Sequence, residues 1–199
     1  MDKIILATAN PNKVKEIKDI LDGHDVMLHS LADLPHFSPI EEDGATFEEN
    51  ALKKAREVYQ KTKTPALADD SGLEIDALDG RPGVLSARYS GKEHDDEANL
   101  RKVLDELKSV PFDKRTARFH CVIAFVGIDV AGQYFEETFH GACEGWIIEE
   151  KRGTNGFGYD PIFWILEHDK TMAELEPAVK NQISHRAVAL KKFKEFFLA

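Results

Sequence analysis

The sequence lacks the features that define several protein classes. Its two cysteines, Cys121 and Cys143, provide neither a metal-binding spacing nor the disulfide framework of a secreted domain. Residues 1–10 lack the basic leader and apolar run of a signal peptide, and no stretch reaches the roughly 20 apolar residues of a membrane span. We find no internal repeat, low-complexity segment or linker. We therefore expect a protein of the reducing cytoplasm that has no membrane partner.

Positive charge is also scarce. The chain has 26 Lys and Arg against 36 Asp and Glu, which gives a formal net charge of −10 and a pI near 5.3. Such a charge argues against binding of nucleic acid through a broad, positively charged surface, so we expect no nucleic-acid partner. A small phosphate ligand is compatible with it, because a few cations and a metal neutralise phosphate locally.

The chain does contain the pattern of an α/β protein. Its 199 residues are 42% hydrophobic, enough for one α/β core and also for two lobes around a cleft. Capping signals and apolar spacing locate the helices, and short apolar or alternating runs locate the strands. We expect helices to start at Asn10, Thr46, near residue 96 and at Ser184, and strands at 3–8, 116–128, 133–149 and 161–166, with another ending at Asp70.

Residues 116–128 and 133–149 are separated by a short connection that contains Gly132. Two strands joined so closely are expected to pair antiparallel. The sheet is therefore predicted to be mixed.

Two adjacent carboxylates, Asp69 and Asp70, end a short apolar run and are followed by Ser71 and Gly72. A strand that ends in acids and then turns is how open α/β sheets present a metal or a catalytic base. Neighbouring side chains of a strand point to opposite faces, so only one aspartate can face a given ligand, and composition does not say which. The alternative is a turn in which Asp70 or Ser71 bonds nearby backbone.

Two helix starts could receive phosphate groups. The turn Thr8–Lys13 opens on a helix N-terminus, where unpaired N–H groups and the helix dipole favour an anion, and Lys13 adds a charge. It is not a Walker A loop, because the glycines and the Lys-Ser/Thr pair are lacking. His185 and Arg186 lie in the first turn of the last helix, with Lys180 upstream. The alternative in both cases is an ordinary capped helix.

The acids Glu41, Glu42 and Asp43 precede the Thr46 cap. They could be dipole partners of that helix or hard oxygen ligands, and Mg²⁺ usually takes one or two carboxylates plus substrate phosphates. On the same helix, Asn50 and Lys54 share a face beside the core stripe, which could be a solvated edge.

The loop Gly156-Phe-Gly-Tyr-Asp160 has two glycines around Phe157. This arrangement lets backbone approach a ligand, and an exposed Phe157 would suit stacking on a base. A core phenylalanine is the alternative. Acids, helix N-termini, basic side chains and this aromatic together suit a metal-bound nucleoside polyphosphate.

Several motifs in the same order resemble the bacterial inosine/xanthosine triphosphate pyrophosphatases over nearly the whole chain. They are Thr8-x-Asn10-x-x-Lys13, Glu41-Glu42-x-Gly44-x-Thr46-Phe47-x-Glu49-Asn50-Ala51, Ala68-Asp69-Asp70-Ser71-Gly72-Leu73, Gly80-x-Pro82-Gly83-x-x-Ser86-Ala87-Arg88-Tyr89, residues 156–163 and Lys180-x-x-Ile183-Ser-His-Arg186.

The resemblance implies a long mixed β-sheet with flanking helices, two lobes around a central cleft, a homodimer, and one pyrophosphatase domain over residues 1–199. It implies Mg²⁺-dependent hydrolysis of ITP, dITP and XTP to the monophosphate and pyrophosphate, which cleanses the nucleotide pool. Asp70 matches the catalytic acid of the family. Glu41 and Asp70 match its metal ligands, and Glu42 is the alternative to Glu41 as the acid that contacts the metal. The substrate contacts it implies are Thr8, Ala9, Asn10, Pro11, Asn12, Lys13, Ser71 and Lys180, with Phe157, Gly158, Tyr159, Asp160, His185 and Arg186 enclosing the base.

Two departures concern the first turn, where Ala9 and Asn12 replace the usual glycine, and a third places Asp43 where threonine is common. Two alternative functions are a pyrophosphatase for other modified nucleotides and a nucleotide sensor without turnover. The presence of Glu41, Asp69 and Asp70 argues against the sensor.

Overall fold

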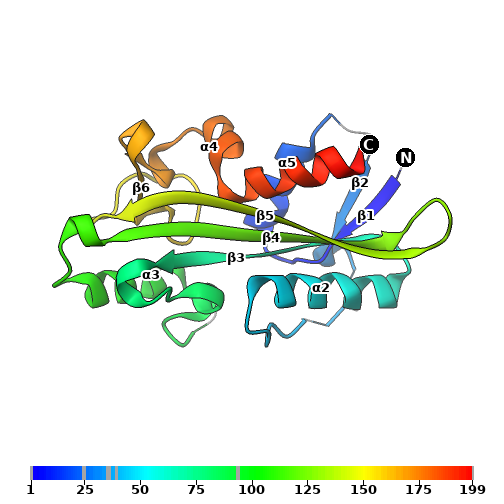
Figure 1. Ribbon diagram of the computed structural model, residues 1–199, viewed down its shortest axis with the longest axis horizontal. Coiled ribbons are helices and arrows are strands. Elements are labelled where there is room, and N and C mark those ends of the chain that lie inside the picture. The colour runs from blue at the N-terminus through cyan, green and yellow to red at the C-terminus, as the bar shows by residue number, and fades with distance from the viewer. Residues whose placement is uncertain (1, 24–25, 35–36, 39, 93–94, 199) are drawn as a thin grey trace. The chain divides into compact units, whose positions relative to one another are not determined.

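The computed structural model describes residues 2–23, 26–34, 37–38, 40–92 and 95–198. Figure 1 labels the main elements. The strands are β1 (Asp2–Leu6), β2 (Val26–Ser30), β3 (Ala66–Ile75), β4 (Thr116–Ile128), β5 (Tyr134–Ile147), β6 (Phe163–Ile165) and β7 (Lys170–Thr171). The α-helices are α1 (Pro11–Leu21), α2 (Phe47–Thr62), α3 (Asp96–Leu107), α4 (Pro177–Ile183) and α5 (His185–Phe197).

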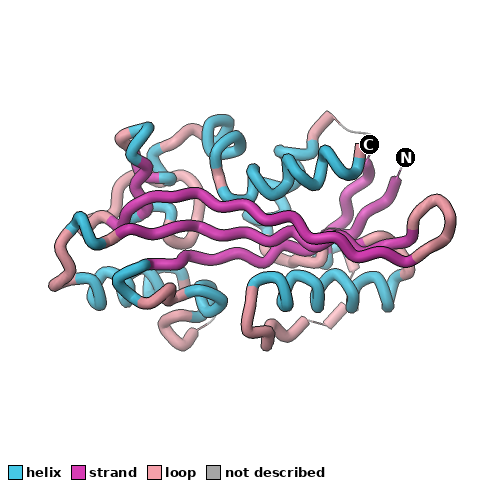
Figure 2. The backbone as a smooth tube through the Cα atoms, viewed as in Figure 1, coloured by secondary structure: helices cyan, strands magenta, loops and turns pink. Residues whose placement is uncertain are grey.

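These strands form one sheet in the order β2-β1-β3-β4-β5-β6-β7. β1 pairs in parallel with β2 and β3, whereas β6 pairs antiparallel with β5 and β7. β4 and β5 are neighbours joined by a tight connection, in which the Asp129 N–H donates to the Gln133 carbonyl at 2.8 Å. Figure 2 shows this hairpin as two long magenta strands. The mixed sheet with flanking helices is thus confirmed.

The chain divides into two compact units, and the resemblance implies the same number of lobes. The first unit comprises Met1–Asp70, Cys121–Gly141 and Val188–Ala199, and the second comprises Ser71–His120 and Ala142–Ala187. β3, β4 and β5 contribute residues to both units, and the boundary in β3 falls at Asp70 and Ser71.

The first unit buries apolar side chains on both faces of its part of the sheet. One face packs with α1 and the end of α5, and α2 lies on the other side of the strands from α5 (Figure 1). The α1 and α5 face buries Ile4, Leu6, Ile17, Leu21, Leu67, Cys121, Ile123, Phe125, Ala189, Leu190 and Phe193. Side chains alternate along a strand, so Asp69 follows Leu67 onto this face, and Asp70 points to the face covered by α2.

The second unit has its own core, in which α3 packs through Leu100, Val103 and Leu107. The same cluster contains Tyr89 and Tyr159, each of which belongs to one of the sequence motifs. α3 is therefore a fixed support for the loops around it.

The structure corrects the prediction that the strand ends at Asp70 and turns on Ser71-Gly72. β3 continues to Ile75, because Leu73 and Ile75 extend the alternation and are both fully buried. The alternative of a turn at Asp70 or Ser71 is wrong for the same reason.

Other boundaries differ for local reasons. The strand expected at 161–166 is reduced to Phe163–Ile165, because a 3-10 turn occupies Asp160–Ile162. Ser184 adopts an extended conformation, which separates the additional helix α4 from α5.

Candidate active site

Asp69 and Asp70 have different partners because they point to opposite faces of β3. Asp69 has a fully buried side chain, and its Oδ1 lies 2.6 Å from Nζ of Lys13 on α1. The Cys121 thiol donates to the other oxygen of Asp69 at 3.2 Å. Asp70 lies 2.8 Å from Nζ of Lys54 through Oδ1, and the Asn50 side chain approaches its Oδ2 at 3.4 Å. Each aspartate is thus held by a helix on its own face.

Lys54 is the centre of a buried cluster of oxygen atoms. Besides Asp70, its ammonium donates to Oε1 of Glu42 at 2.6 Å and to the carbonyl of Asp69 at 2.7 Å. Burial acts to lower the pKa of Lys54, but Asp70 and Glu42 outweigh it, and the pKa is raised. Lys54 therefore stays charged and holds the two carboxylates together.

Burial raises the pKa of Asp70 above its usual value, although Lys54 and Lys13 act to lower it. A raised pKa makes a carboxylate a stronger proton acceptor, which suits a general base. This combination of burial and specific charge partners is typical of functional acids, although structural ion pairs also produce it.

The oxygen atoms of this cluster have the chemistry of a magnesium site. Two carboxylates, from Glu42 and Asp70, already converge on one cation, the Lys54 ammonium. Hard oxygen donors in this number fit Mg²⁺, which completes its shell with water and phosphate. Across the described residues, no group of three or more His, Cys, Asp or Glu could hold a metal by itself.

Glu41, the predicted metal ligand, has an exposed side chain. The pKa of Lys53 is raised chiefly by its hydrogen bond to Asp43; burial acts to lower it, and the charges of Asp43 and then Glu41 add to the increase. Glu42 is the acid that shares Lys54 with Asp70. The assignment of Glu41 stays a prediction, and the geometry favours its neighbour.

The predicted phosphate turn lies at the start of α1. The Asn10 side chain caps this helix by accepting from the N–H groups of Asn12 and Lys13, at 3.0 and 3.3 Å. Thr8 accepts the Asn10 N–H through Oγ1 at 3.1 Å. Ala9, Pro11 and Asn12 are exposed, and the Lys13 ammonium is directed to Asp69. Lys13 is the member of this turn that the structure brings to the acidic pair.

The remaining predicted residues belong to the second unit. Asp160 is buried, and its Oδ2 accepts from Nζ of Lys180 at 2.6 Å and from the Phe157 N–H at 2.9 Å. Gly156 has a φ of +75°, and a Cβ there would lie 2.0 Å from Oδ2 of Asp160, so only glycine fits. Lys180, on α4, is thus paired with an acid of the loop that carries Phe157.

Phe157 is half-buried, and two cations lie near its ring. Nζ of Lys180 and Cζ of Arg186 are 5.1 and 5.8 Å from its centroid. Arg186 is 1% exposed and donates to Oγ of Ser71 at 2.9 Å. His185 stacks on Phe119 with ring centroids 4.8 Å apart. Ser71, Phe157, Asp160, Lys180 and Arg186 therefore form one connected group.

The sequence is compatible with Asn50 and Lys54 on a solvated edge of their helix, yet both side chains are buried beside Asp70. Their spacing on one face of α2, directly beside the core stripe, was the available signal. Asn50 also accepts the Gly44 N–H at 2.8 Å, which ties the acidic segment to the helix.

Comparison with known proteins gives consistent matches over the whole chain. A model of the Ham1 family matches residues 4–196. A dITP/XTP pyrophosphatase of Bacillus subtilis is 51% identical over 199 residues, which are 100% of this chain and 98% of the relative. One of Geobacter sulfurreducens is 53% identical over 195 residues, 98% of this chain and 96% of the relative. The solved structure of a HAM1 protein from Coxiella burnetii has 43% identity, a TM-score of 0.88, and coverage of 100% of this chain and 99% of that chain.

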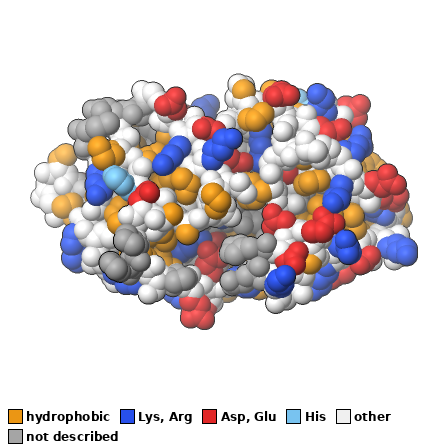
Figure 3. Space-filling view, turned by 180° about the vertical axis from the view of Figure 1, so that it is seen from behind, with side chains coloured by type: hydrophobic (Ala, Val, Ile, Leu, Met, Phe, Trp, Pro, Cys, Tyr) orange, Lys and Arg blue, Asp and Glu red, His pale blue; other side chains and the backbone are white. Residues whose placement is uncertain are grey.

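Figure 3 shows acidic and basic side chains interspersed over the face that it presents. Within the described part of the chain, no helix has the length and apolar character needed to cross a membrane.

Proposed function

Because this chain belongs to the Ham1 family, we propose that it hydrolyses dITP, ITP and XTP to the nucleoside monophosphate and pyrophosphate. Relatives named dITP/XTP pyrophosphatases are about half identical to it over almost its full length, as the 51% identity to the Bacillus subtilis protein illustrates. The structural observation that carries the proposal is the buried Asp70, held with Glu42 by one lysine at the end of the first unit's part of β3.

In this proposal Asp70 is the general base. It takes a proton from a water molecule as the water oxygen attacks the α-phosphorus. The bond from that phosphorus to the oxygen bridging to the β-phosphorus breaks, and pyrophosphate leaves with the bonding electrons. General bases typically contribute a factor of about 10²–10⁴ to the rate.

We assign the metal to Asp70 together with one acid of the Glu41-Glu42 pair. Mg²⁺ bound there would supply positive charge to the triphosphate oxygens. Lys13, which is paired with Asp69, would neutralise part of the triphosphate's negative charge from the side of α1. Phosphoryl transfer depends mostly on such positioning and charge neutralisation.

We assign the base to the second unit. Phe157 stacks on the purine, and Arg186 donates to the C6 carbonyl that hypoxanthine and xanthine present. Adenine presents an amino donor there, which would leave buried Arg186 donors unpaired at a cost of about 1–3 kcal/mol or more. The ion pair of Lys180 with Asp160 supports this loop, so we propose that role for Lys180 in place of the substrate contact that the resemblance implies.

Two further properties belong to the proposal. The family resemblance supports association into a homodimer, and the substrates and scarce cysteines support a cytoplasmic location.

The test is a nucleotide panel of dITP, ITP, XTP, dGTP, GTP and ATP, assayed for pyrophosphate with and without Mg²⁺. The proposal expects Mg²⁺-dependent turnover of the first three and little of the others. Asp70→Asn, which is nearly isosteric, should lose at least about a hundredfold in kcat while keeping its unfolding temperature. Methylated and pyrimidine triphosphates are assayed beside this panel. Their turnover in place of dITP and XTP would favour the related pyrophosphatase, and binding without turnover would favour the sensor.

A further inference from the structure

The motif Gly80–Tyr89 and helix α3 have no role in the chemistry described so far. Both lie in the second unit, as does the loop Gly156–Asp160, which we call the base loop. Hydrogen bonds join all three. We propose that Asp96, in the first turn of α3, is a positioning residue that holds the base loop in its selective conformation; this inference rests on the proposed function.

The contact that carries the proposal is between a carboxylate and the backbone. The Gly158 N–H donates to Oδ2 of Asp96 at 2.9 Å. Gly158 has a φ of +62°, a conformation in which local side chains do little to fix the backbone. An anchor from outside the loop therefore has a large share in setting where Phe157 and Tyr159 point.

Asp96 is itself held in place. α3 is packed into the core of the unit by Leu100, Val103 and Leu107. Asp95 caps the helix by accepting the Ala98 N–H at 3.1 Å, which fixes the turn that carries Asp96. An acid in that first turn is also favoured by the helix dipole.

The motif Gly80–Tyr89 supplies a second anchor for the base loop. The Tyr159 hydroxyl donates to the carbonyl of Ser86 at 2.9 Å. Asn99 on α3 donates to the Ala87 carbonyl at 3.2 Å and accepts the Ser90 N–H at 2.7 Å. The motif and α3 thus form one hydrogen-bonded support that reaches the base loop at Tyr159 and at Gly158.

These contacts also occupy backbone donors of the base loop. The Phe157 N–H is taken by Asp160, and the Gly158 N–H by Asp96. A released Gly158 N–H would be a donor able to pair with acceptors on any purine, guanine included. When Asp96 holds the Gly158 N–H away from the base, Arg186 alone distinguishes deaminated purines from the others. Loss of Asp96 should therefore reduce the preference for deaminated purines.

Three variants test this inference. Asp96→Ala removes the acceptor, and Asp96→Asn keeps an oxygen that can accept. Glu97→Ala is the matched control, because Glu97 is an acid in the same helical turn that pairs with Lys151 at 2.6 Å and leaves the Gly158 contact intact. Both positions are exposed, so all three variants should retain the fold, as unfolding temperatures can verify.

The first readout is hydrogen exchange at the Gly158 amide, followed by NMR on the full chain without nucleotide. In Asp96→Ala the exchange rate of this amide should rise about tenfold. A tenfold change corresponds to the loss of a hydrogen bond that contributes about 1.4 kcal/mol. Asp96→Asn should restore most of the protection, and Glu97→Ala should leave it unchanged. Equal exchange in wild type and Asp96→Ala would overturn the inference.

The second readout is the ratio of kcat/KM for dITP over dGTP and over dATP. In Asp96→Ala both ratios should narrow about tenfold, chiefly through a raised KM for dITP, because slight misplacement of a substrate-positioning group can cost up to about a hundredfold. Unchanged ratios, or equal narrowing in Glu97→Ala, would contradict a positioning role. If the wild type fails to hydrolyse dITP, the proposed function is wrong, and amide exchange alone then decides whether Asp96 holds the loop.

Discussion

The Lys54 ammonium lies 2.8 Å from Oδ1 of Asp70 and also 2.6 Å from Oε1 of Glu42. The side chains of Lys54 and Asp70 are only 6% and 7% exposed, so this lysine is a built-in cation beside the proposed base.

Lys54→Met should therefore harm both stability and catalysis. It leaves Asp70 and Glu42 without their shared cation, and removing one partner of a buried ion pair typically costs about 3–5 kcal/mol. Without Lys54, which acts to lower the pKa of Asp70, that pKa should rise further. The acidic limb of the pH–rate profile should then move to higher pH.

Lys53→Met is the matched control for this variant. Lys53 pairs with Asp43 at 2.5 Å, but both side chains are substantially exposed, so the loss of stability should be much smaller than for Lys54→Met. Chemical denaturation of both variants in EDTA gives the comparison. Equal destabilisation by the two substitutions would contradict the role given to Lys54.

Glu41 and Glu42 can be separated by their effect on metal dependence. Glu42→Gln should raise the Mg²⁺ concentration for half-maximal activity more than Glu41→Gln, because Glu42 is the acid that shares a cation with Asp70. Titration of activity with Mg²⁺ at saturating dITP measures this. A larger increase of this Mg²⁺ concentration in Glu41→Gln would support Glu41 as the metal ligand, as the resemblance implies.

Arg186 and Phe157 should affect selectivity differently. Stacking on Phe157 is indifferent to base identity, so Phe157→Ala should lower activity on ITP and ATP together, by roughly 1–3 kcal/mol. Arg186→Ala should lower ITP turnover far more and narrow the ITP-to-ATP ratio of kcat/KM. An Arg186→Ala enzyme with the full ITP preference would move the discrimination to another donor.

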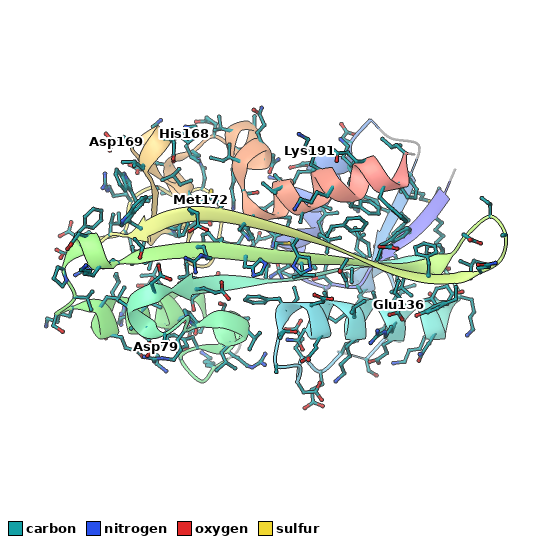
Figure 4. The ribbon with its side chains drawn as sticks, viewed as in Figure 1. Asp79, Glu136, His168, Asp169, Met172 and Lys191 are labelled. Carbon is teal, nitrogen blue, oxygen red and sulfur yellow. The ribbon has the colours of Figure 1, made fainter. Side chains whose placement is uncertain are left out.

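Glu136 on β5, labelled in Figure 4, gives a pH dependence that is independent of catalysis. It accepts from Nε of Arg56 on α2 at 2.8 Å and also bonds Nη2 of Arg56 and the Tyr134 hydroxyl. The Arg56 hydrogen bond, opposed by burial and aided by Tyr134, lowers the pKa of Glu136. An acid with a lowered pKa stabilises the fold above its unfolded pKa and loses that contribution as pH falls through the folded value.

Glu136→Gln should thus lower stability at pH 7 by up to about 1 kcal/mol, or roughly 2–4 °C in unfolding temperature for a chain of this length. The difference from wild type should shrink below about pH 4.3, the usual glutamate pKa, and vanish at lower pH. Thermal unfolding at pH 7 and in acid measures it. A difference that persists in acid would assign the effect to packing.

The sequence predicted those elements whose signals are local. Asn10 and Thr46 cap their helices as expected, and the alternation in 116–128 correctly located β4. The end of β3 was missed because Ser71-Gly72 has turn composition, whereas burial of Leu73 and Ile75 in a different part of the fold keeps the strand extended.

The partners within the candidate site depend on tertiary contacts. Which aspartate faces which helix follows from the phase of β3 relative to α1 and α2, and no spacing in the sequence sets that phase. For the same reason Lys54 could not be distinguished from a solvated lysine, and the ion pair of Lys180 could not be foreseen. Its pairing with Asp160 spans 20 residues and depends on the positive φ of Gly156.

The central claim is hydrolysis of dITP at the α-phosphorus, and ¹⁸O-labelled water tests it most directly. With Mg²⁺ present, the account predicts equimolar dIMP and pyrophosphate, with the label in dIMP only and with the reaction lost in Asp70→Asn. Orthophosphate as the initial product, or label in the pyrophosphate, would mean attack at another phosphorus and would contradict the account.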